Sequence, residues 1–214
     1  MSPSATRGTD EPATLLDVAA ERRRDAIARA VEETALELFA ARPMPQVTVN
    51  EIAATAGISV RTLYRYFPTK EHVFTCMPRR GAETIATRLA AEPARHAPFD
   101  ALRSAVSSAC GDIDRTELDR WMRALARSGE IDRLARMALV TSSDVLAVAI
   151  QQRFADRGNE LVVDMAANMV AGAMAVGTKH WAVTGGDVGE HILAALDIAG
   201  SGLRGLSHGK TRRT

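Results

Sequence analysis

The chain has 214 residues, of which 46% are hydrophobic and 25% are charged, with 27 basic and 26 acidic side chains. These proportions exclude wholesale disorder, and a net charge near zero does not identify a partner. The longest apolar-rich stretch, residues 165–176, is far shorter than the roughly 20 residues that a bilayer span needs, and no signal peptide is recognisable. We therefore expect a soluble, cytoplasmic protein. Cys76 and Cys110 lack partners at metal-ligand spacing, which indicates buried thiols and no metal or cofactor.

The first part of the chain predicts a series of short helices. A first helix is expected from Glu21 to just before Pro43, because apolar residues recur there at steps of three and four. Thr48 then opens a second helix with the sequence Thr-Val-Asn-Glu, a capping box in which Glu51 should reach back to the Thr48 N–H. Gly57 is expected to end this helix in a tight turn.

A third helix follows directly. Ser59 is placed to cap it, it should run through Phe67, and Pro68 interrupts the chain before a fourth helix that starts near Lys70. Small residues on the second helix would let it pack closely on Leu63. Two short helices joined by a glycine turn are typical of a helix-turn-helix.

The remaining two thirds of the chain also predict helices and no convincing strand. The clearest are an alanine-rich helix at 160–183 and a helix at 188–199. The small residues of the first, with Ile192, Leu196 and Ala199 of the second, are candidates for a dimer interface, because close helix approach needs small side chains. The alternative is that these faces form the core of one chain. The expected fold class is all-α, with about nine helices.

The run Thr48–Glu71 closely resembles the DNA-binding signature of the TetR family of bacterial transcriptional regulators. Arg42 and Pro43 depart from that family, whose first helix usually ends in Gly. The matching residues are Thr48, Ile52, Ala53, Ala56, Gly57, Ile58, Ser59, Thr62, Leu63, Tyr64, Tyr66, Phe67, Lys70 and Glu71.

The resemblance implies an N-terminal helix-turn-helix domain and a C-terminal helical domain for ligand binding and dimerisation. We expect a disordered leader at 1–18, the DNA-binding domain at 19–70, the ligand-binding and dimerisation domain at 71–203, and a basic flexible tail at 204–214. The partners would be a double-stranded DNA operator with an inverted repeat, a second copy of the chain and a small effector.

The physics of the motif divides the DNA contacts into two groups. Arg61 can pair with both acceptors of a guanine edge. The adjacent Arg65 adds positive charge, although it could also be a solvated side chain. Phosphate contacts are expected from Thr48, Tyr64, Tyr66 and Lys70, and base contacts from Ser59, Val60, Arg61 and Thr62.

The helical body is expected to enclose an adaptable apolar pocket, since Met and aromatic side chains are spread over several of its helices. The body also weakly resembles a TetR subgroup whose bodies are similar to acyl-CoA-binding domains. An acyl-CoA-like or an aromatic effector would fit such a pocket. Pro78 is a candidate kink through which the fourth helix could couple pocket and DNA. The candidate ligand-binding residues are Met77, Trp121, Met122, Leu125, Met137, Phe154 and Met169.

Two further patterns favour other functions only weakly. The GxGxxG run at 200–205 follows a helix near the end of the sequence and cannot open a βαβ unit. His180 lacks an acid-base partner at a suitable spacing. We therefore expect a ligand-responsive repressor and not an enzyme. The alternatives are an enzyme that acts on a small apolar substrate, and an adaptor that binds DNA without sequence preference.

Overall fold

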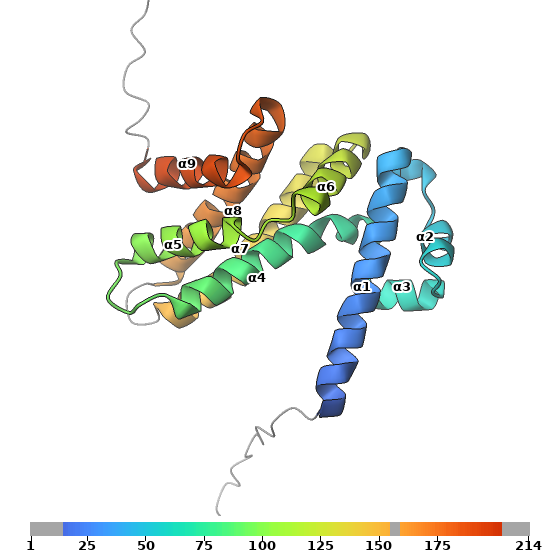
Figure 1. Cartoon of the computed structure of the whole chain (residues 1–214), viewed down its shortest axis with the longest axis horizontal. Coiled ribbons are helices and arrows are strands. Elements are labelled where there is room, and N and C mark those ends of the chain that lie inside the picture. The colour runs from blue at the N-terminus through green and yellow to red at the C-terminus, as the bar shows by residue number, and fades with distance from the viewer. Residues whose placement is uncertain (1–14, 155–158, 203–214) are drawn as a thin grey trace, which may run out of the picture.

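Figure 1 shows the computed structural model, which describes residues 15–154 and 159–202. Within these ranges the chain is all-α, as predicted, with nine α-helices and no strand. The helices are α1 (Leu15–Ala41), α2 (Val49–Thr55), α3 (Val60–Tyr66), α4 (Val73–Ala91), α5 (Pro98–Cys110), α6 (Arg115–Arg127), α7 (Ile131–Arg153), α8 (Glu160–Thr184) and α9 (Val188–Gly200). Single 3-10 turns lie at Met44–Gln46 and Lys70–His72.

The helix boundaries differ from the predicted ones at two places. The first helix begins at Leu15 instead of Glu21, so the prediction of a disordered leader is wrong for residues 15–18. These residues belong to a Leu- and Ala-rich run with high helix propensity. The fourth helix begins at Val73, after the 3-10 turn that contains Lys70. The rest of the predicted leader, residues 1–14, and the predicted tail at 204–214 lie outside the described residues.

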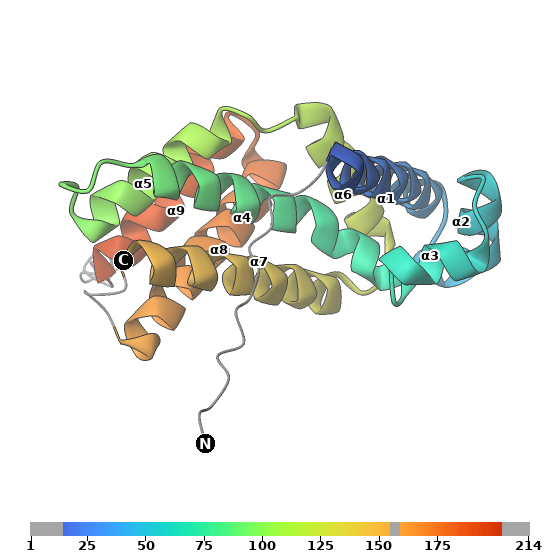
Figure 2. The ribbon, with the colours of Figure 1, turned by 90° about the horizontal axis from the view of Figure 1, so that it is seen from below.

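The molecule is elongated, with α2 and α3 at one end of its long axis and α5 and α9 at the other (Figures 1 and 2). Helix α4 leads from α3 into the body, where it packs mainly against α7 and α5, while α1 packs along α6. We call α1–α3 the head and α4–α9 the body. Side chains from both form one core, in which Phe39 of α1 stacks on Phe74 of α4 and Leu134 of α7 is fully buried. The head is therefore packed onto the body.

Helix α4 continues past Pro78, the residue expected to kink it. A proline has no N–H, so it cannot donate to the carbonyl of Phe74, four residues earlier. The indole Nε1 of buried Trp121, from α6, donates to this carbonyl oxygen at 3.1 Å. Trp121 thus satisfies the main-chain acceptor that Pro78 leaves open, and it links α6 to α4.

Helices α8 and α9 approach each other closely at Gly177. A β-carbon at this position would lie 2.5 Å from the Cα of Ile192, so the contact requires glycine. Ile192 and Leu196 are buried in the body core. The prediction that these two residues form a dimer interface is therefore wrong, because a single chain already buries both side chains. Ala199 is exposed.

Helices α7 and α8 are each long and apolar enough to cross a membrane by length and composition. The sequence-based expectation considered only an uninterrupted apolar run and so underestimated them. Core helices of soluble proteins pass the same test. Here α7 and α8 pack on each other, and Leu146, Val170 and Ala171 lie in the body core. This packing accounts for part of their apolar character: about a third of each apolar window is buried within the chain, whereas other apolar side chains, such as Val140 and Val176, are exposed.

Candidate nucleic-acid interface and helical pocket

The helix-turn-helix at the end of the head is built by local hydrogen bonds. Thr48 Oγ1 accepts from the Glu51 N–H at 3.2 Å and caps α2, and Ser59 Oγ accepts from the Thr62 N–H at 3.1 Å and caps α3. Between them Gly57 adopts a φ of 69°, in the left-handed region that glycine enters without strain. The caps and the turn fix the angle between the two helices.

The second half of the predicted capping box does not form. The Glu51 carboxylate pairs with Arg42 instead of reaching back to the Thr48 N–H. Arg42 and Pro43 follow the first helix, at the position where the family that the sequence resembles usually has glycine. Helix α1 ends at Ala41, and the following 3-10 turn places Arg42 beside α2. The Glu51 carboxylate thus forms an ion pair with Arg42 in place of the predicted bond to the Thr48 N–H, and this pair links the end of α1 to α2.

The two faces of α3 differ sharply. Leu63 is buried with Ile52 and Ala53 of α2, as the sequence predicted. On the opposite face Arg61 and Arg65 are exposed. Half of the Tyr64 side chain is accessible, which is unusual for a large aromatic residue and typical of a binding surface.

Other predicted contact residues are held by neighbours on the same surface. The Arg65 guanidinium lies over the Tyr66 ring, 5.1 Å from its centre, and donates to Tyr66 Oη at 3.2 Å. The hydroxyls of Ser59 and Thr62 are 2.8 Å apart and bonded to each other. Val60 and Thr62 are half-buried. Among the predicted base-reading residues, Arg61 therefore extends most freely from α3.

Lys70 has a structural role that the sequence did not indicate. Its Nζ donates to the main-chain oxygens of Met44 and Val47, at 2.7 and 2.8 Å. These bonds use two of its three N–H groups and hold the turn that precedes α2. One N–H is left for a phosphate.

The seven predicted ligand-binding residues do not converge on one cavity. Trp121, Leu125 and Met137 belong to the core shared with the head, whereas Phe154 and Met169 belong to the body core; Met77 and Met122 contact both. The structure therefore does not bring these seven side chains together around one cavity. These positions are apolar because they fill the two cores, and periodicity does not distinguish core residues from cavity residues.

A pocket of about 410 Å³ lies instead beside α4, between α1, α6, α8 and α9. Of the seven predicted residues, only Met77 lines it. The apolar part of its wall includes Leu118, Met174 and Ile192. Its volume is within the range of small-molecule sites. Unlike the predicted pocket, it also has a charged rim.

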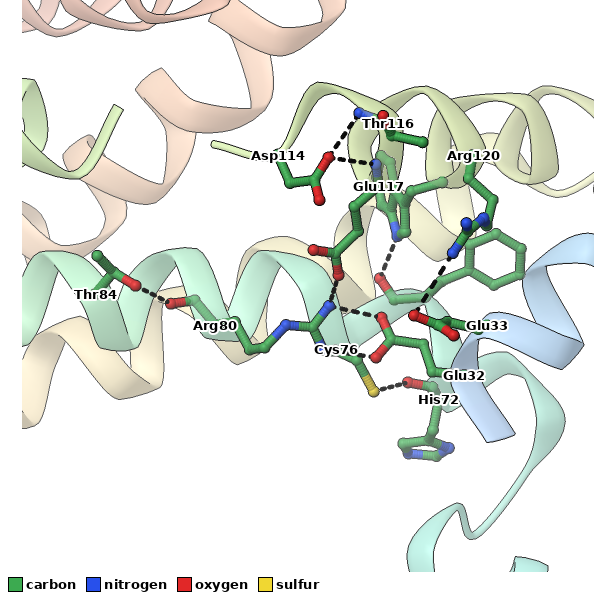
Figure 3. A network of polar contacts seen from close by, with 12 residues as sticks. Glu32, Glu33, His72, Cys76, Arg80, Thr84, Asp114, Thr116, Glu117 and Arg120 are labelled. Carbon is green, nitrogen blue, oxygen red and sulfur yellow. Dashed lines mark hydrogen bonds and ion pairs between the residues drawn. The ribbon is translucent and has the colours of Figure 1, made fainter. Parts of the chain in front are cut away.

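Three charged residues from three helices contact one another, as Figure 3 shows, and two of them, Arg80 and Glu117, line the pocket. The Arg80 guanidinium of α4 donates to both oxygens of Glu32 of α1, at 2.5 and 3.0 Å, and also to Glu117 of α6. Glu32 is 3% exposed, and its burial makes the pairing with Arg80 necessary. Their wide sequence separation hid this triad from sequence reasoning, because no local spacing marks it. The triad joins the head to the pocket.

The two cysteines are free, and each is partly buried, where the sequence indicated buried thiols. Burial raises the pKa of the Cys76 thiol to about 12 and that of Cys110 to about 11. Both thiols are therefore protonated at neutral pH, which suits packing and not nucleophilic chemistry. His180 lies near the end of α8, where its Nδ1 is 3.2 Å from Nδ1 of His191 of α9. That pairing was not predicted. The described residues contain no cluster of three potential metal ligands.

The sequence matches known regulators. Residues 33–75 match the model of the bacterial regulatory proteins of the tetR family. The chain is 27% identical over 194 residues to MftR of Mycobacterium tuberculosis, named for transcriptional regulation of mycofactocin biosynthesis, with 87% of this chain and 96% of the relative covered. It is 30% identical over 115 residues to the HTH-type transcriptional regulator TcmR of Streptomyces glaucescens, covering 54% of this chain and 49% of that one.

The fold is also that of solved regulators. The TetR family repressor AlkX of Dietzia aligns with a TM-score of 0.54 at 19% identity, covering 80% of this chain and 94% of that one. FadR of Thermus thermophilus, solved with lauroyl-CoA, aligns with a TM-score of 0.53 at 21% identity, covering 87% and 98%. At these identities the likeness concerns the fold alone.

Proposed function

We propose that this chain, which belongs to the TetR family of transcriptional regulators, represses transcription by binding a palindromic operator as a dimer and leaves it when a small molecule binds. The observation that carries the proposal is the outer face of α3, where Arg61, Tyr64 and Arg65 are exposed on a helix fixed by caps and a glycine turn. A rigid helix of this kind fits the major groove of DNA. This function would place the protein in the cytoplasm.

Within this proposal, contacts fall into two classes. Arg61 reads a base, with Ser59, Val60 and Thr62 close to the same groove. Thr48, Tyr64, Tyr66 and the remaining N–H of Lys70 contact phosphates, and Arg65 adds charge beside them. The predicted division at residue 70 is retained for DNA binding, with residues 71–203 for effector binding and dimerisation.

The proposed dimer uses large apolar side chains that one chain leaves in water. Each of them is more than half exposed, and a set of this kind marks an interaction surface. A two-fold interface between α8 and α9 of two copies would bury them and would set two heads apart for two half-sites. The residues are Leu161, Val162, Met165, Val176 and Val183 of α8 and Ile198 of α9.

The effector would enter the pocket beside α4. Arg80 and Glu117 line this pocket, and Arg80 also binds Glu32 of the head, so a ligand there contacts the link between body and head. FadR of Thermus thermophilus was solved with lauroyl-CoA, and SmeT with triclosan. An effector acts only through a difference in affinity between the DNA-bound and free forms, typically about 1–3 kcal/mol.

Footprinting on the DNA that flanks the coding region tests the proposal. We expect protection of an inverted repeat, with affinity that falls steeply as salt rises, because the bound phosphates release counterions. The same protection on unrelated DNA would favour the non-specific adaptor, and turnover of a ligand in the pocket would favour the enzyme.

The dimer has its own test. Val176→Glu should yield a monomer in light scattering and weaken operator binding, because it places a charge in the proposed interface. Val140→Glu is the control, since Val140 of α7 is similarly exposed, at 57% against 60%, but lies on another helix. If both variants stay dimeric, the α8–α9 interface is wrong.

A further inference from the structure

The pocket beside α4 has an apolar wall and a charged rim. The wall is made by Met77, Leu118, Met174 and Ile192. Such a surface accommodates a hydrocarbon chain, which is driven into it by removal of apolar area from water. The wall does not determine the charge of the ligand's head group, so the rim decides which head group is accepted.

The rim carries more negative than positive charge. Its carboxylates belong to Glu83, Asp112, Asp114 and Glu117, and its guanidiniums belong to Arg29 and Arg80. Glu83 and Asp112 have exposed partners outside the pocket, in Arg79 and Arg88. Asp114 caps α6 by accepting from main-chain N–H groups, and it forms no ion pair within residues 15–154 and 159–202. Since Glu83 and Asp112 are already paired, Asp114 and Glu117 are the rim carboxylates that would attract a cationic head and repel an anionic one.

Arg80 is not available to an anion. It donates to both oxygens of Glu32 and to Glu117, so its charge is already shared between two carboxylates. With both carboxylates ionised, the triad has a net charge of −1, which a single positive charge would neutralise. The other guanidinium, Arg29, lies on the exposed surface of α1, where solvent weakens its attraction for an anion.

Glu117 is the carboxylate placed to receive the cation. About a quarter of its side chain is exposed, and both it and its partner Arg80 line the pocket. Figure 3 shows Glu117 reaching down from α6 to the Arg80 guanidinium of α4. Glu32 is almost fully buried, and only Glu117 of the two carboxylates is among the residues that line the pocket.

We propose that the pocket binds a monocationic amphiphile, whose apolar chain lies on the wall and whose positive head pairs with Glu117. This inference rests on the proposed function, of which it specifies the effector chemistry. It differs from the acyl-CoA-like or aromatic effector considered from the sequence. The bound cation competes with Arg80 for Glu117 and so weakens the link between α6 and α4, while Arg80 keeps its bonds to Glu32. The head can then move relative to α6.

The test is calorimetric titration of the full chain with three ligands that share one hydrocarbon chain: decyltrimethylammonium, decanol and decanoate. The ammonium ligand should bind most tightly and decanoate most weakly. Glu117→Gln should weaken ammonium binding about tenfold, as expected for loss of a partly buried charge pair, and should leave decanol binding almost unchanged. Asp119→Asn is the matched control, because Asp119 is an exposed acid on the same helix that does not line the pocket.

Three results would overturn the inference: decanoate binding as tightly as the ammonium ligand, no binding of any of the three, or equal ammonium affinity for the wild type and Glu117→Gln. The titration of the wild type stands even if a variant does not fold. Operator binding is measured separately. Glu117-dependent ammonium binding without a change in operator affinity would support the cation site and contradict the proposed release mechanism.

Discussion

The Trp121 indole N–H donates to the main-chain oxygen of Phe74, the acceptor that Pro78 leaves without its helical donor. A proline inside a helix normally costs a hydrogen bond. Here a tryptophan from α6 supplies it and packs edge-on against the Phe74 ring, 6.4 Å between ring centres. The first part of α4, which connects head and body, is thus fastened to α6 at the site of its missing bond.

Replacing Trp121 by Phe should lower the free energy of unfolding by about 1–3 kcal/mol beyond the effect of lost apolar area, because it leaves a buried carbonyl unsatisfied. Pro78→Ala supplies an N–H to the same carbonyl. In that background the cost of Trp121→Phe should shrink, which a double-mutant cycle by urea denaturation would measure. Equal costs in both backgrounds would show that the two residues are not coupled.

The close approach of α8 and α9 predicts opposite effects for two glycines of one helix. Gly177→Ala should destabilise the chain by several kcal/mol, because the new methyl group would overlap the main chain of Ile192. Gly172→Ala should be neutral or stabilising by up to about 1 kcal/mol, since nothing lies within 4 Å of the added carbon and alanine is the better helix former. Thermal unfolding of both variants is the measurement. If Gly177→Ala left the melting temperature unchanged, α8 and α9 would have to lie farther apart than the structure shows.

Two neighbouring arginines of α4 should contribute very differently to stability. Arg80→Ala leaves Glu32 buried without its partner, which costs about 3–5 kcal/mol. Arg79 forms an exposed pair with Glu83, so Arg79→Ala should cost less than about 1 kcal/mol. Denaturant titration compares the two. Similar costs would indicate that the Arg80 triad does not hold the head on the body.

Local signals in the sequence predicted the head well. Thr48, Gly57 and Ser59 each act within four residues of their own position, so the caps, the turn and the exposed face of α3 could be predicted from short runs. Glu51 was assigned to a local cap, but a stronger partner, Arg42, competes for it in the folded chain.

The pocket could not be predicted in the same way. Its charged link joins Glu32, Arg80 and Glu117, which come from three helices, and no spacing connects them. Trp121 is a large aromatic residue of the kind that lines ligand sites. In the folded chain it is buried instead, and its indole N–H donates to the main-chain oxygen of Phe74. The sequence shows that a side chain is apolar but not whether it faces a cavity or another side chain, so only the packed structure separates core from pocket.

Substitutions on α3 should separate base contacts from phosphate contacts. Arg61→Ala should weaken operator binding by about 1–3 kcal/mol per half-site and relax the preference at one base pair. Tyr64→Phe removes one hydroxyl and should weaken binding about equally for all operator variants, by roughly 0.5–1.5 kcal/mol. Binding to a set of single-base operator variants measures both. Unchanged base preferences in Arg61→Ala would contradict its assignment.

Lys70→Ala should differ from Tyr64→Phe by lowering stability together with DNA affinity. Its Nζ holds two main-chain oxygens before α2, and their loss loosens the turn that positions the head. Melting temperature and operator affinity should be measured on the same samples. A variant with reduced DNA affinity but an unchanged melting temperature would show that Lys70 acts only on phosphate.

The most direct test of the account is the ratio of affinities for the footprinted inverted repeat and for a scrambled duplex of equal length, measured at one salt concentration. Sequence-specific recognition by the exposed face of α3 predicts a ratio of about 1,000 or more for the wild type, and a clearly smaller ratio for Arg61→Ala. Equal affinity of the wild type for the two duplexes would contradict the claim that this chain is an operator-binding repressor.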